Sequence, residues 1–267
     1  MIMENKIRKC LPQEVDRIAP LFADWEETLI WSCLQGVMGD IYVPDGKDPV
    51  SAAAQLNDFC FLTGEPCADM VTFDYGRDFL IMVPQNESWA ELIEEVLGDK
   101  AARRMRYAIK KEPNCFDACK LSALVDMLPK QYEIHRIDRT LYEQCFENAW
   151  SSDLVSGYPA YEDFERLGIG FVITENGKIV SGASSYSRYN EGIEIEIDTK
   201  EEYRRNGLAA SAASALILEC LNCGLYPSWD AHNKASVALA EKLGYSFSHE
   251  YLVYEVKNNL ADLLTTP

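Results

Sequence analysis

The stretch that decides the fold reads Ile195-Glu-Ile-Asp-Thr-Lys-Glu-Glu-Tyr-Arg-Arg-Asn-Gly-Leu-Ala209. It predicts a strand, a short charged loop and the start of a helix that continues to Cys223. A strand that turns into a helix through a glycine presents several unpaired backbone amides at the positive end of the helix dipole. Such a turn binds anions, and a pyrophosphate fits it. Gly207 and the small Ala209 leave room for a phosphate to approach the backbone.

The composition is that of an acidic globular protein. The 267 residues include 25 Lys and Arg and 43 Asp and Glu, for a formal net charge of −18. A chain this acidic repels nucleic-acid phosphates, which disfavours a broad DNA- or RNA-binding surface. No apolar run reaches the roughly eighteen residues of a membrane span, and the first residues lack the apolar core of a signal peptide. We therefore expect a cytoplasmic protein that engages neither nucleic acid nor membrane.

The cysteines and histidines do not form a metal-binding pattern. The nine cysteines are an odd number, and the three histidines, His135, His232 and His249, are scattered along the chain. Cys220-x-x-Cys223 lies at the end of an apolar helix, where small buried residues are expected. We expect free thiols and no metal site.

The C-terminal half predicts a run of antiparallel strands followed by alternating helices and strands. Asn176-Gly177 favours a type I′ turn, because both residues accept positive φ angles. Gly224 and Gly244 are placed to end helices. The elements expected here are strands over 168–174, 179–188 and 193–199, a helix to 223, a strand over 226–231, a helix over 233–243 and a strand over 245–256.

The N-terminal half is also a mixture of helices and strands. We expect helices over 12–25, 27–34, 88–97 and 115–127, with strands over 58–63, 78–83 and 131–137. The segment Leu128-Pro129-Lys130 ends a helix and predicts a domain boundary. The domains expected are therefore an N-terminal α/β subdomain over 1–129 and a C-terminal domain over 130–267.

Two separated motifs resemble those of the GNAT acyltransferase superfamily. The first is Tyr203-Arg-Arg-Asn-Gly-Leu-Ala209, and the second is Asn233-Lys-Ala-Ser236 followed by Glu241-Lys-Leu-Gly-Tyr245. The match covers 131–256 and implies an α+β fold, with a mixed, mostly antiparallel sheet flanked by helices. With its Asp58-Phe-Cys-Phe-Leu-Thr-Gly-Glu-Pro66 strand and turn, the whole chain is similar to a bacterial GNAT subgroup that includes the zwittermicin A resistance acetyltransferase.

The resemblance implies how acetyl-CoA would bind. In this superfamily the strand before the loop parts from the next strand, and the pantetheine arm pairs with its backbone, here at Ile195 and Ile197. The diphosphate would lie on the loop amides, with Arg204 or Arg205 adding positive charge, and Asn233 and Ser236 would contact the arm from the other side. The loop residues implied are Arg204, Arg205, Asn206, Gly207, Leu208 and Ala209.

Acyl transfer to an amine needs a base, an oxyanion donor and a leaving thiolate. Strand alternation places Glu194, Glu196 and Asp198 on one face of the sheet. One of these carboxylates could be the base, or the three could simply form the solvent-exposed face. We expect Glu196 as the base, then Glu194. The resemblance places a proton-donating tyrosine where this chain has Ala240. Either the donor is His232, another nearby group such as Tyr226 or Tyr158, or a water, or the thiolate leaves without protonation, since a thiol of ordinary pKa is an adequate leaving group near neutral pH.

The function implied is transfer of an acetyl group from acetyl-CoA to the primary amine of a small molecule, an amino-bearing antibiotic or metabolite, by direct transfer. The aromatic segment from Trp150 to Pro159 would then close over the acceptor. Two alternatives stay open: a tandem GNAT transferase, with 1–129 a degenerate copy of the fold and a bulkier acyl or aminoacyl donor, or a CoA-binding module without catalysis. The sequence identifies neither the acceptor nor the oligomeric state.

Overall fold

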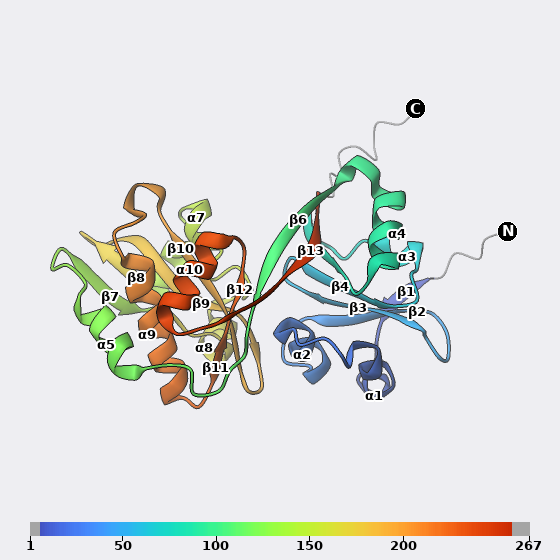
Figure 1. The fold of residues 1–267 in the computed structure, drawn as a ribbon, viewed down its shortest axis with the longest axis horizontal. Coiled ribbons are helices and arrows are strands. Elements are labelled where there is room, and N and C mark those ends of the chain that lie inside the picture. The colour runs from blue at the N-terminus through green and yellow to red at the C-terminus, as the bar shows by residue number, and fades with distance from the viewer. Residues whose placement is uncertain (1–5, 258–267) are drawn as a thin grey trace. The chain divides into compact units, whose positions relative to one another are not determined.

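The computed structural model describes residues 6–257, which divide into two compact units (Figure 1). The N-terminal unit runs up to Arg106 and includes the residues from Tyr251 onward, and the C-terminal unit is Tyr107–Glu250. The division therefore lies elsewhere than at Pro129. Residues just before Pro129 belong with the C-terminal unit because α5 (Ala118–Asp126) packs against α9 (Leu208–Asn222), where Ser211 Oγ donates to the Leu124 carbonyl at 2.9 Å.

The N-terminal unit is built on a mostly antiparallel sheet in the order β1-β2-β3-β4-β5-β13-β6. Among the pairs β1–β2, β2–β3, β3–β4, β4–β5 and β5–β13, only β4 and β5 are parallel. The strands are β1 (Ile7–Lys9), β2 (Asp40–Pro44), β3 (Ser51–Leu56), β4 (Phe59–Gly64), β5 (Phe79–Pro84), β6 (Ala101–Ile109) and β13 (Phe247–Lys257). The division between the units falls inside β6 and β13, so each of these strands contributes residues to both units.

The helices of the N-terminal unit are short. The helix expected over 12–25 is instead three consecutive short pieces that end at Phe22, because Pro20 lacks the amide hydrogen that a continuous α-helix needs. The helical elements are η1 (Pro12–Glu14), α1 (Val15–Ile18), η2 (Ala19–Phe22), α2 (Thr28–Gln35), α3 (Ala68–Thr72), α4 (Glu87–Leu97) and η3 (Gly98–Lys100).

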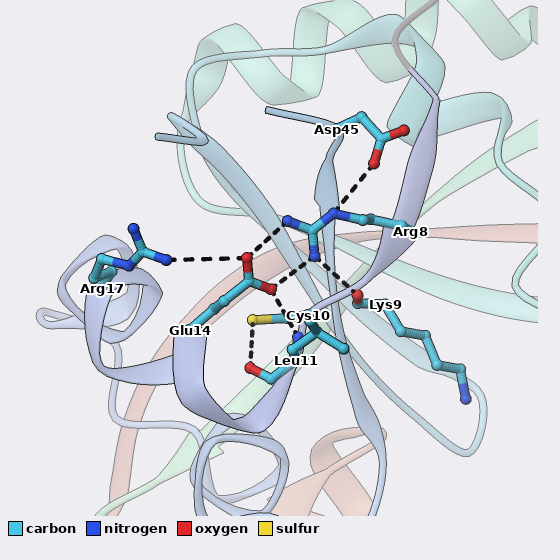
Figure 2. Close-up of polar contacts among 7 residues, drawn as sticks. All are labelled: Arg8, Lys9, Cys10, Leu11, Glu14, Arg17 and Asp45. Carbon is cyan, nitrogen blue, oxygen red and sulfur yellow. Dashed lines mark hydrogen bonds and ion pairs between the residues drawn. The ribbon is translucent and has the colours of Figure 1, made fainter. Parts of the chain in front are cut away.

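A cluster of charged residues connects β1 with η1 and with the residue that follows β2 (Figure 2). Arg8 on β1 donates to both carboxylate oxygens of Glu14, at 2.7 and 2.9 Å, and its Nε lies 3.1 Å from Asp45. Glu14 also accepts from the Leu11 amide at 2.9 Å. These bonds to the charged form hold the pKa of Glu14 down at about 2, so this carboxylate keeps its partners at neutral pH.

Trp89 is the centre of the N-terminal core. It is fully buried on α4 together with Ala90 and Ile93, and its indole donates to the Gly64 carbonyl at 2.9 Å. The helix begins there because the Asn86 side chain accepts the Trp89 amide and caps the first turn. Met70, Leu80 and Tyr254 complete the cluster around it.

The C-terminal unit contains a five-stranded sheet in the order β11-β10-β9-β8-β7. The predicted hairpin is confirmed: Asn176 and Gly177 have φ angles of 51° and 75° and join β8 to β9. The further elements are β7 (Tyr132–Arg136), α6 (Arg139–Cys145), α7 (Ala149–Ser152), α8 (Tyr161–Leu167), β8 (Gly170–Glu175), β9 (Lys178–Tyr189), β10 (Gly192–Thr199), η4 (Glu201–Tyr203), β11 (Tyr226–Ser228), β12 (Asp230–Ala231) and α10 (Lys234–Leu243).

The two faces of this sheet have different coverings. Ile193 and Ile195 belong to a core cluster with α9 and α5, which cover one face. On the other face α7 contacts β9 and β10, and Leu154, just after α7, lies against Gly182 and accepts a hydrogen bond from Ser184 at its carbonyl. The carboxylates of β10 alternate with the isoleucines and so belong to this second face.

The two units repeat one order of elements. In each, a first strand and short helices precede three antiparallel strands, after which a helix, a parallel strand, a second helix and a final strand follow. Thus β4-α3-β5-α4-β6 corresponds to β10-α9-β11-α10-β13. No helix among the described residues is both long enough and apolar enough to cross a bilayer.

Replacing Trp89 by Ala should lower the free energy of unfolding by about 3–5 kcal/mol, the usual cost of emptying a buried aromatic site. Urea unfolding followed by circular dichroism measures this. The control is Val50→Ala, since that side chain is 53 % exposed and its truncation should change stability by less than about 0.5 kcal/mol. Equal effects of the two changes would contradict the assigned core.

Candidate functional site

Strands β10 and β11 part from one another and leave a wedge between them. They pair in parallel only from Gly192 with Tyr226 to Glu194 with Ser228. Beyond Ser228 the chain leaves β10, and β12 pairs instead with the end of β6. Among the described strands, none pairs with β10 from Ile195 to Thr199 on that side. We call this open space, bordered by Ile195–Thr199, the wedge.

Backbone amides of β10 are directed into the wedge. In an antiparallel pair, successive residues direct their amides alternately toward and away from the partner strand. Lys200 donates to Val180 at 3.0 Å, so Thr199 and Ile197 direct their amides away from β9. These two amides instead bond the carboxylates next to them: Thr199 to Asp198 Oδ1 at 2.6 Å, and Ile197 to Glu196 Oε1 at 3.2 Å. A ligand with carbonyl groups at this spacing can replace those carboxylates.

A loop suited to an anion lies at the open end of the wedge. Arg205 and Gly207 have positive φ angles of 65° and 82°, and turns of this kind form concave sites lined by amides. Gly207 is the N-cap of α9, and no side chain caps this helix start in the described chain. The amides of Leu208 and Ala209 in the first turn thus lack a capping side chain. The fifteen-residue helix adds a positive dipole.

The loop arginines have different roles. Arg204 Nε donates to the Thr199 carbonyl at 3.1 Å, and its guanidinium lies 3.9 Å from Asp198. Arg204 therefore fixes the loop to the end of β10. The side chains of Arg205 and Asn206 are exposed, so they are the ones available to a bound phosphate.

The residues expected on the second helix take part in its local structure. Asn233 accepts the Ser236 amide at 3.0 Å and caps α10, and Ser236 Oγ accepts the Trp229 indole at 3.1 Å. Ala240 is fully buried, so its methyl group occupies the position where the resemblance implied a tyrosine. His232 lies between β12 and α10 with an exposed side chain.

Carboxylates gather on the face of β10 that α7 covers. Glu194 is only 5 % exposed, whereas Glu196 and Asp198 are half-buried. Burial raises the pKa of Asp198, and the nearby charge of Asp153, just after α7, raises it further. Trp150 Nε1 on α7 is buried and has no hydrogen-bond partner among the described residues. A buried donor suits an oxygen acceptor of a ligand, whereas the carboxylates beside it suit a cationic group.

Two tyrosines considered as proton donors are held elsewhere. Tyr158 is 1 % exposed, and its hydroxyl lies 2.7 Å from Ser185 Oγ in the core. The Tyr226 hydroxyl accepts the Glu112 amide at 3.0 Å. The sequence showed the residue types but not their burial, which the packing of the loop after α7 decides.

The corresponding edge of the N-terminal unit is closed. There β4 and β5 pair from Phe59 with Ile81 to Leu62 with Pro84, and the Gln85 amide continues the ladder to the Leu62 carbonyl. The Gln85 side chain then accepts the Gly64 amide, and Trp89 donates to the Gly64 carbonyl. Side chains thus occupy the backbone groups that a ligand would need, and the N-terminal unit has no counterpart of the wedge among the described residues.

Comparisons with known proteins agree with this geometry. The profile of the GNAT acetyltransferase family matches residues 19–254. The Bacillus subtilis protein named uncharacterized N-acetyltransferase YdfB is 30 % identical over 250 residues, covering 85 % of this chain and 89 % of its own length. A crystal structure of a GCN5-related N-acetyltransferase-like protein from Streptococcus suis has 50 % identity and a TM-score of 0.88, covering 93 % of this chain and 100 % of that chain.

A more distant structure shares the fold alone. The tandem GNAT protein from the clavulanic acid biosynthesis pathway is 12 % identical, with a TM-score of 0.57, and the match covers 94 % of this chain and 98 % of that chain. Its likeness fits the repeated order of elements in the two units.

Replacing Asp153 by Asn should stabilise the protein at neutral pH. Burial raises the folded-state pKa of Asp153 above its unfolded value of 3.8, so ionisation costs stability as the pH rises from that value through the folded pKa. Asn does not titrate. The melting temperature of Asp153→Asn should therefore exceed that of the wild type at pH 7, and the gain should shrink toward pH 4. A difference that is constant from pH 4 to 8 would contradict this.

Proposed function

Because the chain belongs to the GNAT acetyltransferase family, we propose that it transfers an acetyl group directly from acetyl-CoA to the primary amine of a small molecule. The observation that carries this proposal is the wedge, whose edge amides lead from an anion-binding loop to the point where β10 and β11 join. We propose that it acts in the cytoplasm, where acetyl-CoA is available.

The donor would bind by backbone contacts. The diphosphate would lie on the amides of Gly207, Leu208 and Ala209, with Arg205 and Asn206 beside it. The pantetheine amides would then pair with Ile197 and Ile195 as an added strand, and Asn233 and Ser236 would shape the opposite wall through α10. Such pairing needs no particular side chain on the strand, since main-chain groups make the bonds.

Glu194 is the base that the geometry favours over Glu196. It lies in the last residue pair before the strands part and is 5 % exposed, so it is shielded from water beside the point where the thioester would lie. Glu196 accepts the Ile197 amide and stands further along the edge. Glu194 would take the ammonium proton, the amine would attack the carbonyl carbon, and the Ile195 amide would stabilise the oxyanion.

The acceptor would be a cationic amine. Asp153, Asp198 and Glu196 lie on the face that α7 covers, and Trp150 contributes an aromatic ring, whose indole N–H would donate to an oxygen of the acceptor rather than to its ammonium group. Negative charge of this kind attracts an ammonium group and repels a carboxylate. The resemblance to the subgroup that includes the zwittermicin A resistance acetyltransferase makes amino-bearing antibiotics the first acceptors to test.

The proposed position of the diphosphate on the loop before α9 predicts how a charge placed there changes the affinity for acetyl-CoA. Ala209→Glu places a carboxylate in the first turn of α9, where it favours the helix dipole but repels a phosphate. The melting temperature should be unchanged or higher, while the Kd for acetyl-CoA rises on the order of 10-fold. Ala209→Gln is the matched control and should bind several-fold more tightly than Ala209→Glu.

Titration calorimetry measures these affinities and also the stoichiometry, expected to be one acetyl-CoA per chain because the N-terminal edge is closed. Equal affinities of the Ala209→Glu and Ala209→Gln variants for acetyl-CoA would contradict the binding of the diphosphate at this loop. Absence of any binding by the wild type would overturn the proposed function, and binding without thiol release across an amine panel would leave a CoA-binding module.

Two isosteric variants distinguish the candidate bases. Glu194→Gln should lower kcat by a factor of about 10² to 10⁴ and remove the acidic limb of the pH–rate profile. Glu196→Gln retains an oxygen for the Ile197 amide and should change kcat much less. Thiol release measured from pH 6 to 9 makes the comparison, and the reverse order of effects would assign the base to Glu196.

A further inference from the structure

The closed end of the wedge contains a hydroxyl that the reaction above does not use. Ser228 is the last β11 residue paired with β10, opposite Glu194, and it is fully buried. The next residue, Trp229, turns its indole toward Ser236 on α10. Ser228 and Glu194 therefore form the last residue pair before the wedge opens.

The leaving sulfur would reach this end of the wedge. This step rests on the proposed function, in which the diphosphate lies beside Gly207 and the pantetheine arm runs along β10. The edge from Thr199 to Ile195 comprises five residues, so the four steps between them measure about 13 Å at the rise of a strand. An extended pantetheine arm covers that length, so its sulfur would lie beside the Glu194–Ser228 pair.

A tyrosine supports the Ser228 hydroxyl from behind. The hydroxyl of Tyr189 lies 3.1 Å from Ser228 Oγ, and Tyr189 is 2 % exposed. The side chain of Tyr189 passes over β10 at Gly192. A Cβ atom on residue 192 would lie 2.5 Å from the tyrosine oxygen and would also overlap the Tyr226 carbonyl oxygen. Glycine at this position is what lets a β9 side chain reach β11.

The pair is arranged to donate. Either hydroxyl of the pair can donate. A phenol is a stronger acid than an alcohol, and in the direction this favours Tyr189 donates to Ser228 and leaves the serine proton for a third atom. Burial raises the pKa of Tyr189 to about 12, so the phenol remains protonated at neutral pH. On the same sheet face, Ser187, paired in register with Glu194, is fully buried, and its Oγ has no hydrogen-bond partner among the described residues. Unpartnered buried hydroxyls are rare and indicate a place for a polar ligand or water.

We propose that Ser228, positioned by Tyr189, donates the proton to the thiolate that leaves from the acyl donor. The amine nitrogen forms the new bond to the carbonyl carbon, and the carbon–sulfur bond breaks with its electron pair on sulfur. The Ser228 proton passes to that sulfur, and the Tyr189 proton passes to the Ser228 oxygen. The proton that Glu194 took from the amine then restores Tyr189, whose pKa the charge of Glu194 helps to raise. Over the whole reaction, the amine loses one proton and the leaving thiolate gains one, so the number of protons is conserved.

This assignment accounts for Ala240. The buried methyl group at that position supplies no proton, and the exposed His232 is not needed as a donor. Ser228 is the catalytic residue in this scheme, and Tyr189 is a positioning residue that acts through it.

The test compares two acyl donors that differ only in the leaving atom. Ser228→Ala and Tyr189→Phe should lower kcat for acetyl-CoA, the serine variant on the order of 100-fold. With the acetyl selenoester of the selenium analogue of coenzyme A, both variants should react at nearly the wild-type rate. A selenol is much more acidic than a thiol, so its anion leaves without a proton. A merely structural role of the pair would lower both rates equally.

Ser185→Ala is the matched control. It removes a hydroxyl from the other buried tyrosine–serine pair of this unit, with Tyr158, and should keep the wild-type ratio of selenoester to thioester rates. If Ser228→Ala does not fold, Tyr189→Phe alone still tests the proposal, because it keeps the ring. A wild-type ratio in that variant would overturn the proposal, whereas a wild-type protein inactive toward both donors would instead overturn the proposed function.

Discussion

The divergence of β10 from β11 beyond the Glu194–Ser228 pair is the constraint on which the site depends. A sheet normally satisfies every amide of an interior strand, and amides left unpaired are costly when they are buried. Here Asp198 and Glu196 accept the amides of Thr199 and Ile197. The half-buried carboxylates therefore keep the open edge satisfied while remaining exchangeable for the carbonyl groups of a ligand. The same divergence directs the strand end to the loop of Arg204, which the guanidinium fixes to the Thr199 carbonyl.

The two units show how one order of elements can be open or closed. In the C-terminal unit, Gly207 begins a fifteen-residue helix without a capping side chain, and the neighbouring strands part. In the N-terminal unit, the loop after β4 leads to a five-residue helix, and Pro66 in that loop has no amide to offer. Gln85 and Trp89 then occupy the backbone groups of Gly64. Trp89 thereby belongs to the N-terminal core, and Gln85 satisfies the Gly64 amide at the surface.

Polar groups on the second face of the C-terminal sheet connect stability with chemistry. Glu194, Ser187 and Ser228 are nearly or fully buried there, Asp198 is half-buried, and the pKa values of Asp153 and Asp198 are both raised. A fold selected only for stability would place apolar side chains at these positions, since burying polar groups without full pairing costs free energy. Their concentration where the strands part supports the proposal that the reaction takes place on this face.

Local signals determined much of the architecture from the sequence alone. The positive φ angles at Asn176-Gly177, the helix expected over 233–243 and the strand alternation of β10 depend on neighbours a few residues apart, and the structure bears them out. Tertiary packing decided the rest. Contacts between segments far apart in the chain determine that Tyr158 lies in the core and that Glu194 is buried more deeply than Glu196. They also determine that Tyr189 reaches Ser228 across Gly192. Periodicity along one strand does not specify which face a neighbouring element covers.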